Sequence, residues 1–275
     1  LHNLRKITIF ISLVVCVTVR LLRKVVRMNI IEQLYGFNDS PGRNVLLYSG
    51  GCDSTLILHS LLNAYPEKEI YTVAIRYPWL LEEKHESEFQ TRHRYIKHLT
   101  EKGHIIHHSE INVTQSTFDF LDGKKDQKVL NAVAGGSPQA IAWLSLISIY
   151  LDRGDKLYYG ILGSDSNAQY IDYYREGMKY ILTTLDRNNE IELRTPLRYK
   201  NKDYVLRQLL LNNIYDYTWH CEEPISKGVP CLNCHPCQTH LKALVGIEQF
   251  DDSAVLREKA KEILDPIREK LKNDK

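Results

Sequence analysis

The feature that most constrains the fold is a run from residue 48 to residue 55, which reads Tyr-Ser-Gly-Gly-Cys-Asp-Ser-Thr. Apolar residues precede this run and leucines with helical spacing follow it, so the order predicts a strand, a tight turn and a helix. Glycines let backbone N–H groups approach an anion, and the start of a helix favours negative charge. We therefore expect a phosphate group to bind here. The expected contacts are Ser49, Gly50, Gly51, Asp53, Ser54 and Thr55.

Two other nucleotide-binding loops do not match this run. A Walker loop requires a lysine directly after its last glycine, and a dinucleotide-binding fold requires the spacing Gly-x-Gly-x-x-Gly. The run contains neither pattern. The alternative without a ligand is a plain tight turn at Gly50 and Gly51, in which Asp53 only caps the following helix.

Segments typical of strands and of helices alternate along most of the chain. Runs of apolar, β-branched and aromatic residues are followed by polar or amphipathic runs of helical length. Because strands that alternate with helices form parallel sheets covered on both faces, we predict a Rossmann-like α/β fold. The expected strands are residues 44–48, 70–77, 104–111 and 156–162, and the expected helices are residues 82–102, 138–151, 173–185, 202–212 and 254–270.

Four of the six cysteines lie close together near the end of the chain, with the spacing Cys221-x9-Cys231-x2-Cys234-x2-Cys237. Four thiolates can surround one tetrahedral ion, and zinc is the ion that favours such a shell. A closed shell leaves no position for a substrate, so we expect a structural site. An iron–sulfur cluster uses the same ligands and stays open as the alternative. Because this chain is large enough to fold on an apolar core, the clustering indicates a metal site in a reducing cytoplasm instead of disulfide bonds.

The first residues of the chain differ from the rest. Residues 7–19 are apolar and are flanked by arginine and lysine. This run is shorter than the roughly 20 residues that cross a bilayer, and no small-residue cleavage site follows it, so we expect neither a membrane span nor a signal peptide. Met28 opens a stretch that resembles an ordinary N-terminus. We expect an extension outside the fold at residues 1–27, a nucleotide-binding domain at residues 28–215, and a metal knuckle with C-terminal helices at residues 216–275.

The charge balance limits the partners of the chain. It has 36 basic and 34 acidic side chains and a formal net charge of +2. Such a balance produces no strong field that would favour a nucleic acid or a membrane surface. We therefore expect any polyanion that binds to be small.

Motifs from both ends of the chain resemble one family. The run at residues 49–54 matches the Ser-Gly-Gly-x-Asp-Ser signature of the PP-loop ATP pyrophosphatases at every position. Residues 218–221 and 230–237 resemble the Thr-Trp-Ser-Cys and Pro-Cys-Gly-x-Cys-x-x-Cys segments of the 7-cyano-7-deazaguanine synthases. Between them, residues 195–197 followed by Lys202 resemble that family's Thr-Pro-Leu stretch and its lysine, and residues 165–175 weakly resemble its substrate loop.

The resemblance implies a fold of the adenine nucleotide alpha hydrolase type and a ligase of the queuosine pathway. Such an enzyme adenylates 7-carboxy-7-deazaguanine, lets ammonia displace AMP to give an amide, and activates the amide again to form a nitrile. It implies ATP, Mg²⁺ and Zn²⁺ as cofactors, a small-molecule substrate, and no nucleic acid or membrane partner, and it allows a homodimer. The implied roles are Mg²⁺ binding for Asp53, phosphate or carboxylate contacts for Lys202 and Arg175, and base contacts for Tyr170 and Asp172. A surface ion pair is the alternative for Lys202, Arg175 and Asp172.

The chain departs from this family where the substrate would bind. The family's tyrosine-glycine-glutamine segment is absent after the second strand, and residues 84–88 only loosely resemble its histidine and glutamate. Residues 135–139 replace its valine-proline-x-arginine-asparagine turn. Several alternatives therefore stay open: a relative that acts on another deazapurine or couples one to a protein in phage defence, a tRNA thiolase, an amide-forming synthetase of the same superfamily, and a zinc-bearing interaction module without activity. A thiolase would need reactive cysteines and a basic surface.

Overall fold

The computed structural model describes residues 42–77, 81–113, 137–165, 168–184 and 191–273. The extension expected at residues 1–27 lies outside the described residues, and so do residues 78–80 and 135–136. No helix in the described ranges has both the length and the apolar character that crossing a membrane requires. The domain limits expected from the sequence stay a prediction.

Within the described residues, five strands form one parallel sheet. The strands are β1 (Asn44–Leu47), β2 (Ile70–Arg76), β3 (Ile106–Asn112), β4 (Lys156–Tyr158) and β5 (Glu192–Arg194). Their order in the sheet is β3-β2-β1-β4-β5, which confirms the predicted Rossmann-like α/β fold. The strand order reverses between β1 and β4, because the chain first builds the sheet to one side of β1 and then to the other. In open sheets of this kind, ligands bind beyond the carboxyl ends of the strands at the reversal.

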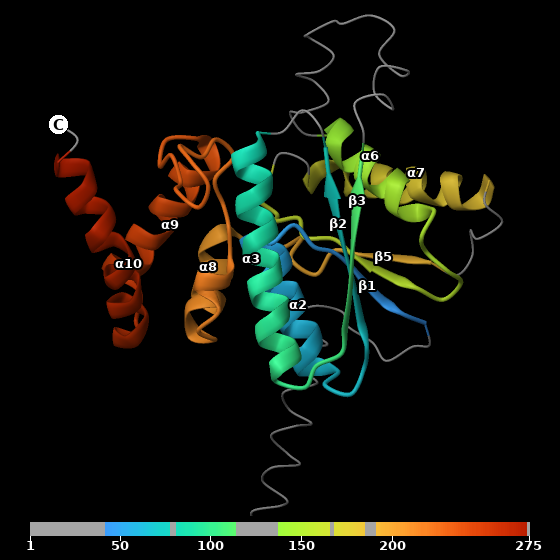
Figure 1. Ribbon diagram of the computed structural model, residues 1–275, viewed down its shortest axis with the longest axis horizontal. Helices are drawn as coiled ribbons and strands as arrows, with labels where there is room; N and C mark the ends of the chain where they lie inside the picture. Colours follow the sequence, from blue (N-terminus) through green and yellow to red (C-terminus); the bar gives the residue numbers. More distant parts are fainter. Residues whose placement is uncertain (1–41, 78–80, 114–136, 166–167, 185–190, 274–275) are drawn as a thin grey trace, which may run out of the picture. The chain divides into compact units, whose positions relative to one another are not determined.

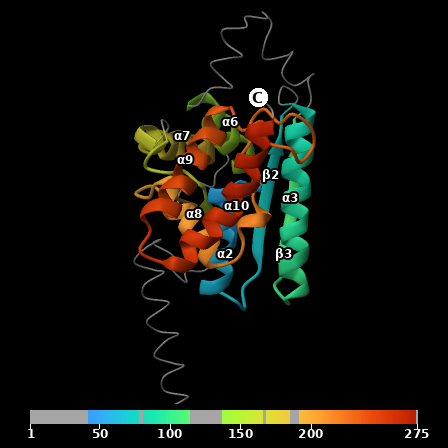
Figure 2. The same cartoon turned by 90° about the vertical axis from the view of Figure 1, so that its left-hand side faces the viewer.

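Helices cover both faces of the sheet (Figures 1 and 2). The helices that follow β1 and β2 lie on one face of the sheet, and the helices that follow β3 and β4 lie on the other. The last three pack against one another, and the first of these also packs against the helix that follows β1. In chain order the helices are α2 (Cys52–Ala64), α3 (Glu82–Glu101), α6 (Ser137–Ser148), α7 (Ile171–Thr184), α8 (Lys202–Leu211), α9 (His235–Phe250) and α10 (Ala254–Asn273), with short 3₁₀ turns η1 (Ala168–Tyr170) and η2 (Tyr215–Tyr217).

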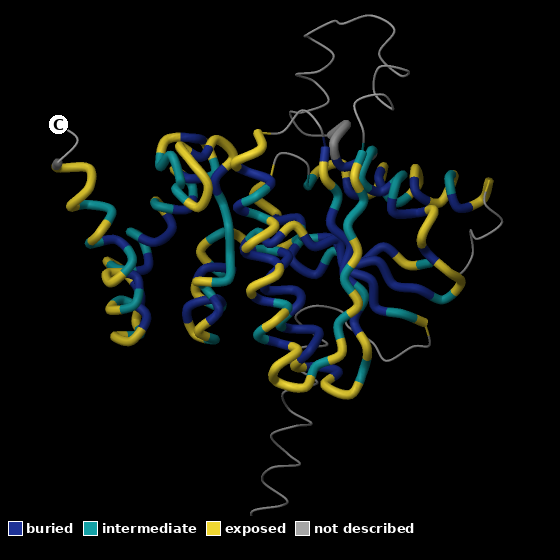
Figure 3. Tube along the Cα trace, viewed as in Figure 1, coloured by how far each residue is buried: buried dark blue, intermediate teal, exposed yellow. Residues whose placement is uncertain are grey.

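The core holds the carboxyl end of β1 in a fixed place. All four residues of β1 are buried, and α2 buries residues on most of its circumference (Figure 3). On the other face, α6 and α7 contribute Leu144 and Met178 to a cluster that also contains Val45 of β1 and Leu157 of β4. Each fully buried apolar side chain of this size contributes roughly 1.5–3 kcal/mol. The loop after β1 therefore stands on a rigid scaffold.

One strand is shorter than the sequence predicts. Residues 156–162 were expected to be extended throughout, but β4 ends at Tyr158. The N–H group of Tyr159 still donates to the carbonyl of Arg194, at 2.9 Å. Beyond it, Gly160 passes over the first turn of α2, where an added Cβ atom would lie 3.3 Å from the backbone nitrogen of Ser54. The chain thus leaves the sheet to approach the loop.

Candidate functional site

The run at residues 48–55 forms the predicted strand, turn and helix. Gly51 is the N-cap residue of α2, and it offers no side chain to accept a hydrogen bond from the first turn of this helix. The N–H group of Gly51 donates to Ser49 Oγ at 3.1 Å, and Ser54 Oγ lies 3.3 Å from Ser49 Oγ. The N–H groups that open α2 therefore remain available to an anion, which is the condition for phosphate binding at a helix N-terminus.

Steric contacts explain why glycine is required in and beside the loop. Gly50 has a φ angle of +84°, and a Cβ atom there would lie 2.8 Å from Cγ of Arg92 and 3.2 Å from the carbonyl oxygen of Glu88. Only glycine adopts this conformation without strain, and only glycine fits this space. Residue 160 is also a glycine, and a side chain there would lie close to the backbone of Ser54. The loop is thus closed from behind by α3 and left open towards the helix start.

An ion pair spans the loop and α8. Lys202, the first residue of α8, places Nζ at 2.9 Å and 3.2 Å from the two carboxylate oxygens of Asp53. Burial lowers the pKa of Lys202, but the carboxylate of Asp53 outweighs this effect and raises the pKa above its ordinary value. Lys202 therefore stays an ammonium ion at neutral pH. The structure brings together two residues that lie far apart in the sequence and that were both predicted to belong to the site.

Two cavities meet at the loop. One has a volume of about 200 Å³ and the other of about 280 Å³. Both are lined by Ser49, Gly51, Asp53, Glu88 and Glu222. The loop therefore forms a common wall that a single nucleotide and a second substrate could both reach.

The two cavities differ in chemistry. The first extends along the ends of β1 and β2, and its walls include the rings of Trp143 and Tyr159, which lie edge to face with centroids 6.4 Å apart. The second extends towards the cysteine knuckle and is lined by Lys202, Asp165 and His220. Burial raises the pKa of Asp165, although its carboxylate accepts a hydrogen bond from the N–H of Leu162. The aromatic walls of the first cavity suit a flat ring, although Lys84 and Arg92 also line it, and the second cavity is lined mainly by polar and charged groups.

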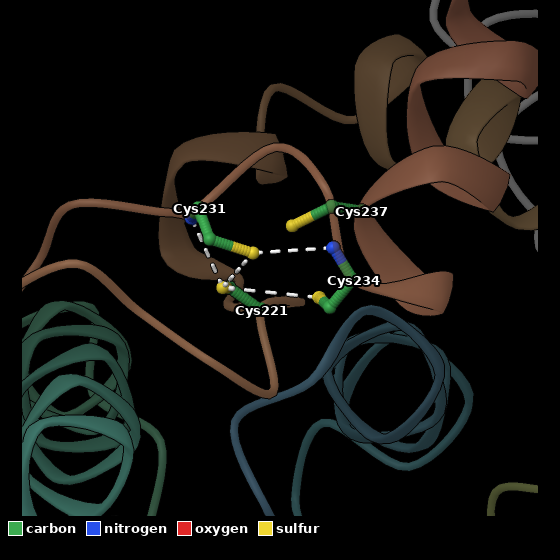
Figure 4. Close-up of side chains that lie close together, drawn as sticks. All are labelled: Cys221, Cys231, Cys234 and Cys237. Atoms are coloured by element: carbon green, nitrogen blue, oxygen red, sulfur yellow. Dashed lines mark hydrogen bonds between the residues drawn. The ribbon is translucent and has the colours of Figure 1, made fainter.

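The four cysteines converge as predicted (Figure 4). Their sulfur atoms all lie within 4.8 Å of one another. Cys221 Sγ is 3.5 Å from Cys231 Sγ and 4.0 Å from Cys234 Sγ. Four thiolates at the usual zinc–sulfur distance would have sulfur atoms about 3.8 Å apart, so the observed spacing fits a single tetrahedral ion. Cys237 lies in the first turn of α9 and completes the set.

The electrostatics of the knuckle favour a thiolate at Cys231. Its sulfur accepts hydrogen bonds from the N–H groups of Asn233, at 3.4 Å, and Cys234, at 3.2 Å. Burial raises the pKa of Cys231, but these donors outweigh it and lower the pKa to about 7. Burial raises the pKa of Cys221 to about 11. A bound cation would replace the missing stabilisation, because metal binding deprotonates coordinating thiols.

The knuckle is connected directly to the loop. The backbone N–H of Trp219 donates to the carbonyl of Gly50 at 2.9 Å, and Gly51 forms a parallel β-bridge with Trp219. The indole N–H of Trp219 donates to the carbonyl of Cys221 at 2.8 Å. The thiol of Cys52 donates to Thr218 Oγ1 at 3.6 Å. One segment, Thr218 to Cys221, therefore contacts both the phosphate loop and the metal site.

Comparison with known families identifies the family of the chain. A family model described as "Queuosine biosynthesis protein QueC" matches residues 43–248, a range that includes the loop, the Asp53–Lys202 pair and the four cysteines. The chain belongs to this family. As a QueC family member it is an ATP-using enzyme of the PP-loop superfamily, with a cysteine cluster able to bind a metal ion.

Three solved structures are similar to this QueC family member. A U34-tRNA thiolase NcsA from Methanococcus maripaludis, solved with its [4Fe-4S] cluster, is 13% identical, with a TM-score of 0.46, and the match covers 86% of this chain and 77% of that one. An NMN synthetase from Francisella tularensis is 16% identical, with a TM-score of 0.42 and coverage of 86% and 90%. A glutamine-dependent NAD⁺ synthetase from Acinetobacter baumannii, in complex with ADP, is 17% identical, with a TM-score of 0.36 and coverage of 86% and 42%. At these scores the likenesses do not bear on function. The search of curated proteins found no match.

Some predicted site residues lie away from both cavities. Arg175 pairs with Asp172 at 2.9 Å and reaches Thr195 Oγ1 at 3.4 Å, and neither Arg175 nor Asp172 lines either cavity. Tyr170 is partly exposed beside Tyr173, with ring centroids 6.4 Å apart. Thr55 is fully buried within α2 and lines neither cavity. For these four predicted residues, contacts with ligand stay a prediction.

Sequence reasoning missed the contribution of α3. Lys84 and Arg92, both buried, line the first cavity, and Glu88 lies between them at 3.8 Å from each. Lys84 also forms an ion pair with Glu222, next to the first cysteine of the knuckle. Arg92 donates to the carbonyl of Ser49 at 3.0 Å. The loose likeness of residues 84–88 to the family's histidine and glutamate was the only available signal for this part of the site.

The knuckle contains one strained residue, and we predict that relieving the strain stabilises the protein. Leu232 has a φ angle of 60° at the position where the family motif has glycine. A left-handed conformation costs a side-chain-bearing residue roughly 1–2 kcal/mol, partly offset by the greater chain entropy of glycine. Leu232→Gly should therefore raise the free energy of unfolding by about 1 kcal/mol and the melting temperature by roughly 2–4 °C.

The matched variant for this test is Leu232→Ala. Alanine removes the same half-buried side chain but keeps the Cβ atom and hence the strain, so the difference between the two variants in thermal unfolding isolates the backbone effect. Equal melting temperatures for the glycine and alanine variants would contradict the prediction, because they would show that the relieved strain is no larger than the chain-entropy cost of glycine.

Proposed function

We propose that the chain is a ligase that converts 7-carboxy-7-deazaguanine and ammonia into 7-cyano-7-deazaguanine, with ATP consumed to AMP and pyrophosphate. The observation that carries the proposal is the open first turn of α2, which faces two cavities of different chemistry at the strand-order reversal. Membership of the QueC family supports this reaction over the other chemistries of PP-loop enzymes.

The loop supplies the groups that activation of a carboxylate requires. A carboxylate oxygen attacks the α-phosphorus, and the bond to pyrophosphate breaks. Backbone N–H groups at the start of α2, together with Lys202, would stabilise the negative charge of the leaving pyrophosphate. Asp53 and Asp165 both line the second cavity, and carboxylates with phosphate oxygens are the ligands that Mg²⁺ prefers. These two residues are the proposed holders of the metal ion.

The two cavities suggest how the substrates divide. The aromatic cavity along the ends of β1 and β2 would take the adenine ring, since flat rings stack on Trp and Tyr side chains. The second cavity would take the deazapurine carboxylate and ammonia. Burial, and to a smaller extent the charge of Lys202, lowers the pKa of His220 to about 4. The ring is therefore neutral at pH 7 and does not compete with Lys202 for the substrate carboxylate.

Zinc is the proposed ion of the knuckle. The sulfur atoms, within 4.8 Å of one another, suit one ion, whereas a four-iron cluster between the same ligands would hold them farther apart. Four thiolates leave no open position, so the ion would hold the segment Thr218 to Cys221 in place and take no part in the reaction.

The experiment uses the zinc-loaded full chain with ATP, Mg²⁺, ammonium and 7-carboxy-7-deazaguanine. Mass spectrometry should detect AMP together with the amide or the nitrile, and omission of ammonium should leave neither product. AMP formation that depends instead on another deazapurine, an added tRNA or a protein acceptor would reject this substrate and favour the corresponding relative. Absence of any ATP turnover would support an interaction module without activity.

A further inference from the structure

A second group of metal-ligating side chains lies away from the cysteine knuckle. His108 and Glu110 lie two residues apart on β3, the edge strand of the sheet, and so point to the same face. On that face α3 contributes His93. One ligand atom from each of the three residues lies within 4.8 Å of the others. His108 and Glu110 are mostly buried, with side chains 10% and 22% exposed, whereas His93 is exposed and leaves an entry path.

The hydrogen bonds of the two histidines are compatible with one metal-binding nitrogen on each ring. His93 Nδ1 lies 2.9 Å from the carbonyl oxygen of Phe89, and because a carbonyl only accepts, Nδ1 carries the proton and Nε2 has the lone pair. His108 Nδ1 lies 2.9 Å from the hydroxyl of Thr72, which can accept as well as donate. When Nδ1 of His108 donates to Thr72, its Nε2 has the lone pair, and a bound ion would take the place of the contact that Nε2 makes with Glu110 Oε1 at 3.4 Å. In metal-binding histidines, the ring nitrogen that does not bind the metal typically donates a hydrogen bond in this way.

Neighbouring groups orient the carboxylate of Glu110. Glu110 Oε1 accepts from Arg92 at 2.8 Å and lies 3.4 Å from His108 Nε2. A distance of 3.4 Å is also close to that between neighbouring ligands of one ion bound at about 2.0–2.1 Å.

We propose that His93, His108 and Glu110 form a binding site for a divalent transition-metal ion. Two imidazole nitrogens and one carboxylate suit Zn²⁺, Fe²⁺ or Ni²⁺ and disfavour Mg²⁺ and Ca²⁺, which prefer oxygen ligands. Three protein ligands leave positions for water or another ligand. The ion would tie α3 to the edge of the sheet. Arg92, which binds both Glu110 and the carbonyl of Ser49, connects this site to the phosphate loop.

The experiment counts ions bound by the full chain without nucleotide. Dialysis against buffered Zn²⁺ followed by elemental analysis should give two zinc ions per wild-type chain and one for His93→Ala. Glu110→Gln should weaken the second ion about tenfold or more. The matched control is His107→Ala, because His107 is also on β3 but is exposed and pairs with Glu69 at 3.0 Å. This control should keep both ions.

Cobalt distinguishes the two sites by spectroscopy. The first equivalent of Co²⁺ should produce the intense near-ultraviolet band of thiolate ligands, and the second should add only weaker visible bands that His93→Ala removes. Circular dichroism checks that each variant is folded, and Glu110→Gln keeps the test decisive should one variant unfold. One ion per wild-type chain, or equal loss of zinc in His93→Ala and His107→Ala, would overturn the proposal.

Discussion

Removal of the proposed zinc ion from the four-cysteine knuckle is expected to lower the melting temperature by on the order of 10 °C and to weaken ATP binding about tenfold. The first effect follows because structural zinc contributes its binding free energy to folding, and several kcal/mol shift the melting temperature of a chain this size by that amount. The second follows from the segment Thr218 to Cys221. Its hydrogen bond from Trp219 to Gly50, worth about 1 kcal/mol or somewhat more, loses its anchor when Cys221 is released.

Calorimetry and nucleotide titration on holo, chelated and reconstituted protein measure both effects. Cys221→Ser should behave like the chelated protein, whereas Cys52→Ser, which alters a buried thiol outside the cluster, should keep the knuckle ion. Restoration of both properties by added Zn²⁺ would separate metal loss from irreversible damage. If the chelated protein melted lower but bound ATP with unchanged affinity, the knuckle would support the fold without positioning the loop.

The loop and the knuckle could be predicted from the sequence because their signals are local. A glycine pair between an apolar run and a helical run fixes strand, turn and helix within one short segment, and Gly50 does adopt the left-handed conformation. Cysteines with two residues between them can share one ion wherever the chain folds. For this reason both the phosphate loop and the four converging sulfur atoms appear where they were expected.

The other parts of the fold and of the site depend on contacts between distant segments, which no local sequence pattern indicates. β5 has three residues, too few for a periodic signal, and it is a strand because it pairs with β4. α9 begins inside the knuckle, where the cysteine motif obscured its apolar positions Leu244 and Ile247. Lys84 and Arg92 lie on a helix that reads as polar, and their burial becomes visible only when α3 packs beside the loop.

The residues that weakly resemble the family's substrate loop also show that sequence alone does not reveal which residues come together in the fold. Asp172 forms ion pairs with Arg175, at 2.9 Å, and Arg198, at 3.2 Å, on an exposed surface of α7. A sequence likeness places residues in a segment but does not say which way the segment faces. Lys202, in contrast, follows a short motif that the family shares. Its position at the start of α8 directs its side chain to Asp53.

Lys202→Gln is expected to lower the turnover number for AMP formation by about 10²–10³-fold while changing the Michaelis constant for ATP only severalfold. In the proposed reaction the ammonium group would face the charge that grows on pyrophosphate in the transition state, and glutamine provides a dipole without the charge. Stability should fall by only about 1–2 kcal/mol, since the side chains of Lys202 and Asp53 are 20% and 24% exposed. Steady-state kinetics and thermal unfolding measure the two effects separately. Lys200→Gln is the matched control, because it removes the same charge two residues earlier, where the ammonium lies 4.7 Å from the ring of Tyr204.

A double-mutant cycle decides whether the pair of Lys202 and Asp53 acts in the reaction or only in the fold. If Asp53 orients the ammonium and holds Mg²⁺ beside it, adding Asp53→Asn to Lys202→Gln should cost much less turnover than it does in the wild type, since groups that act as a unit are not additive. A structural ion pair predicts a different pattern, in which both single variants lower the melting temperature and leave the turnover number within severalfold of the wild type. Equal turnover in Lys200→Gln and Lys202→Gln would have the same meaning, because it would show that charge in this region matters only in general and not at the loop.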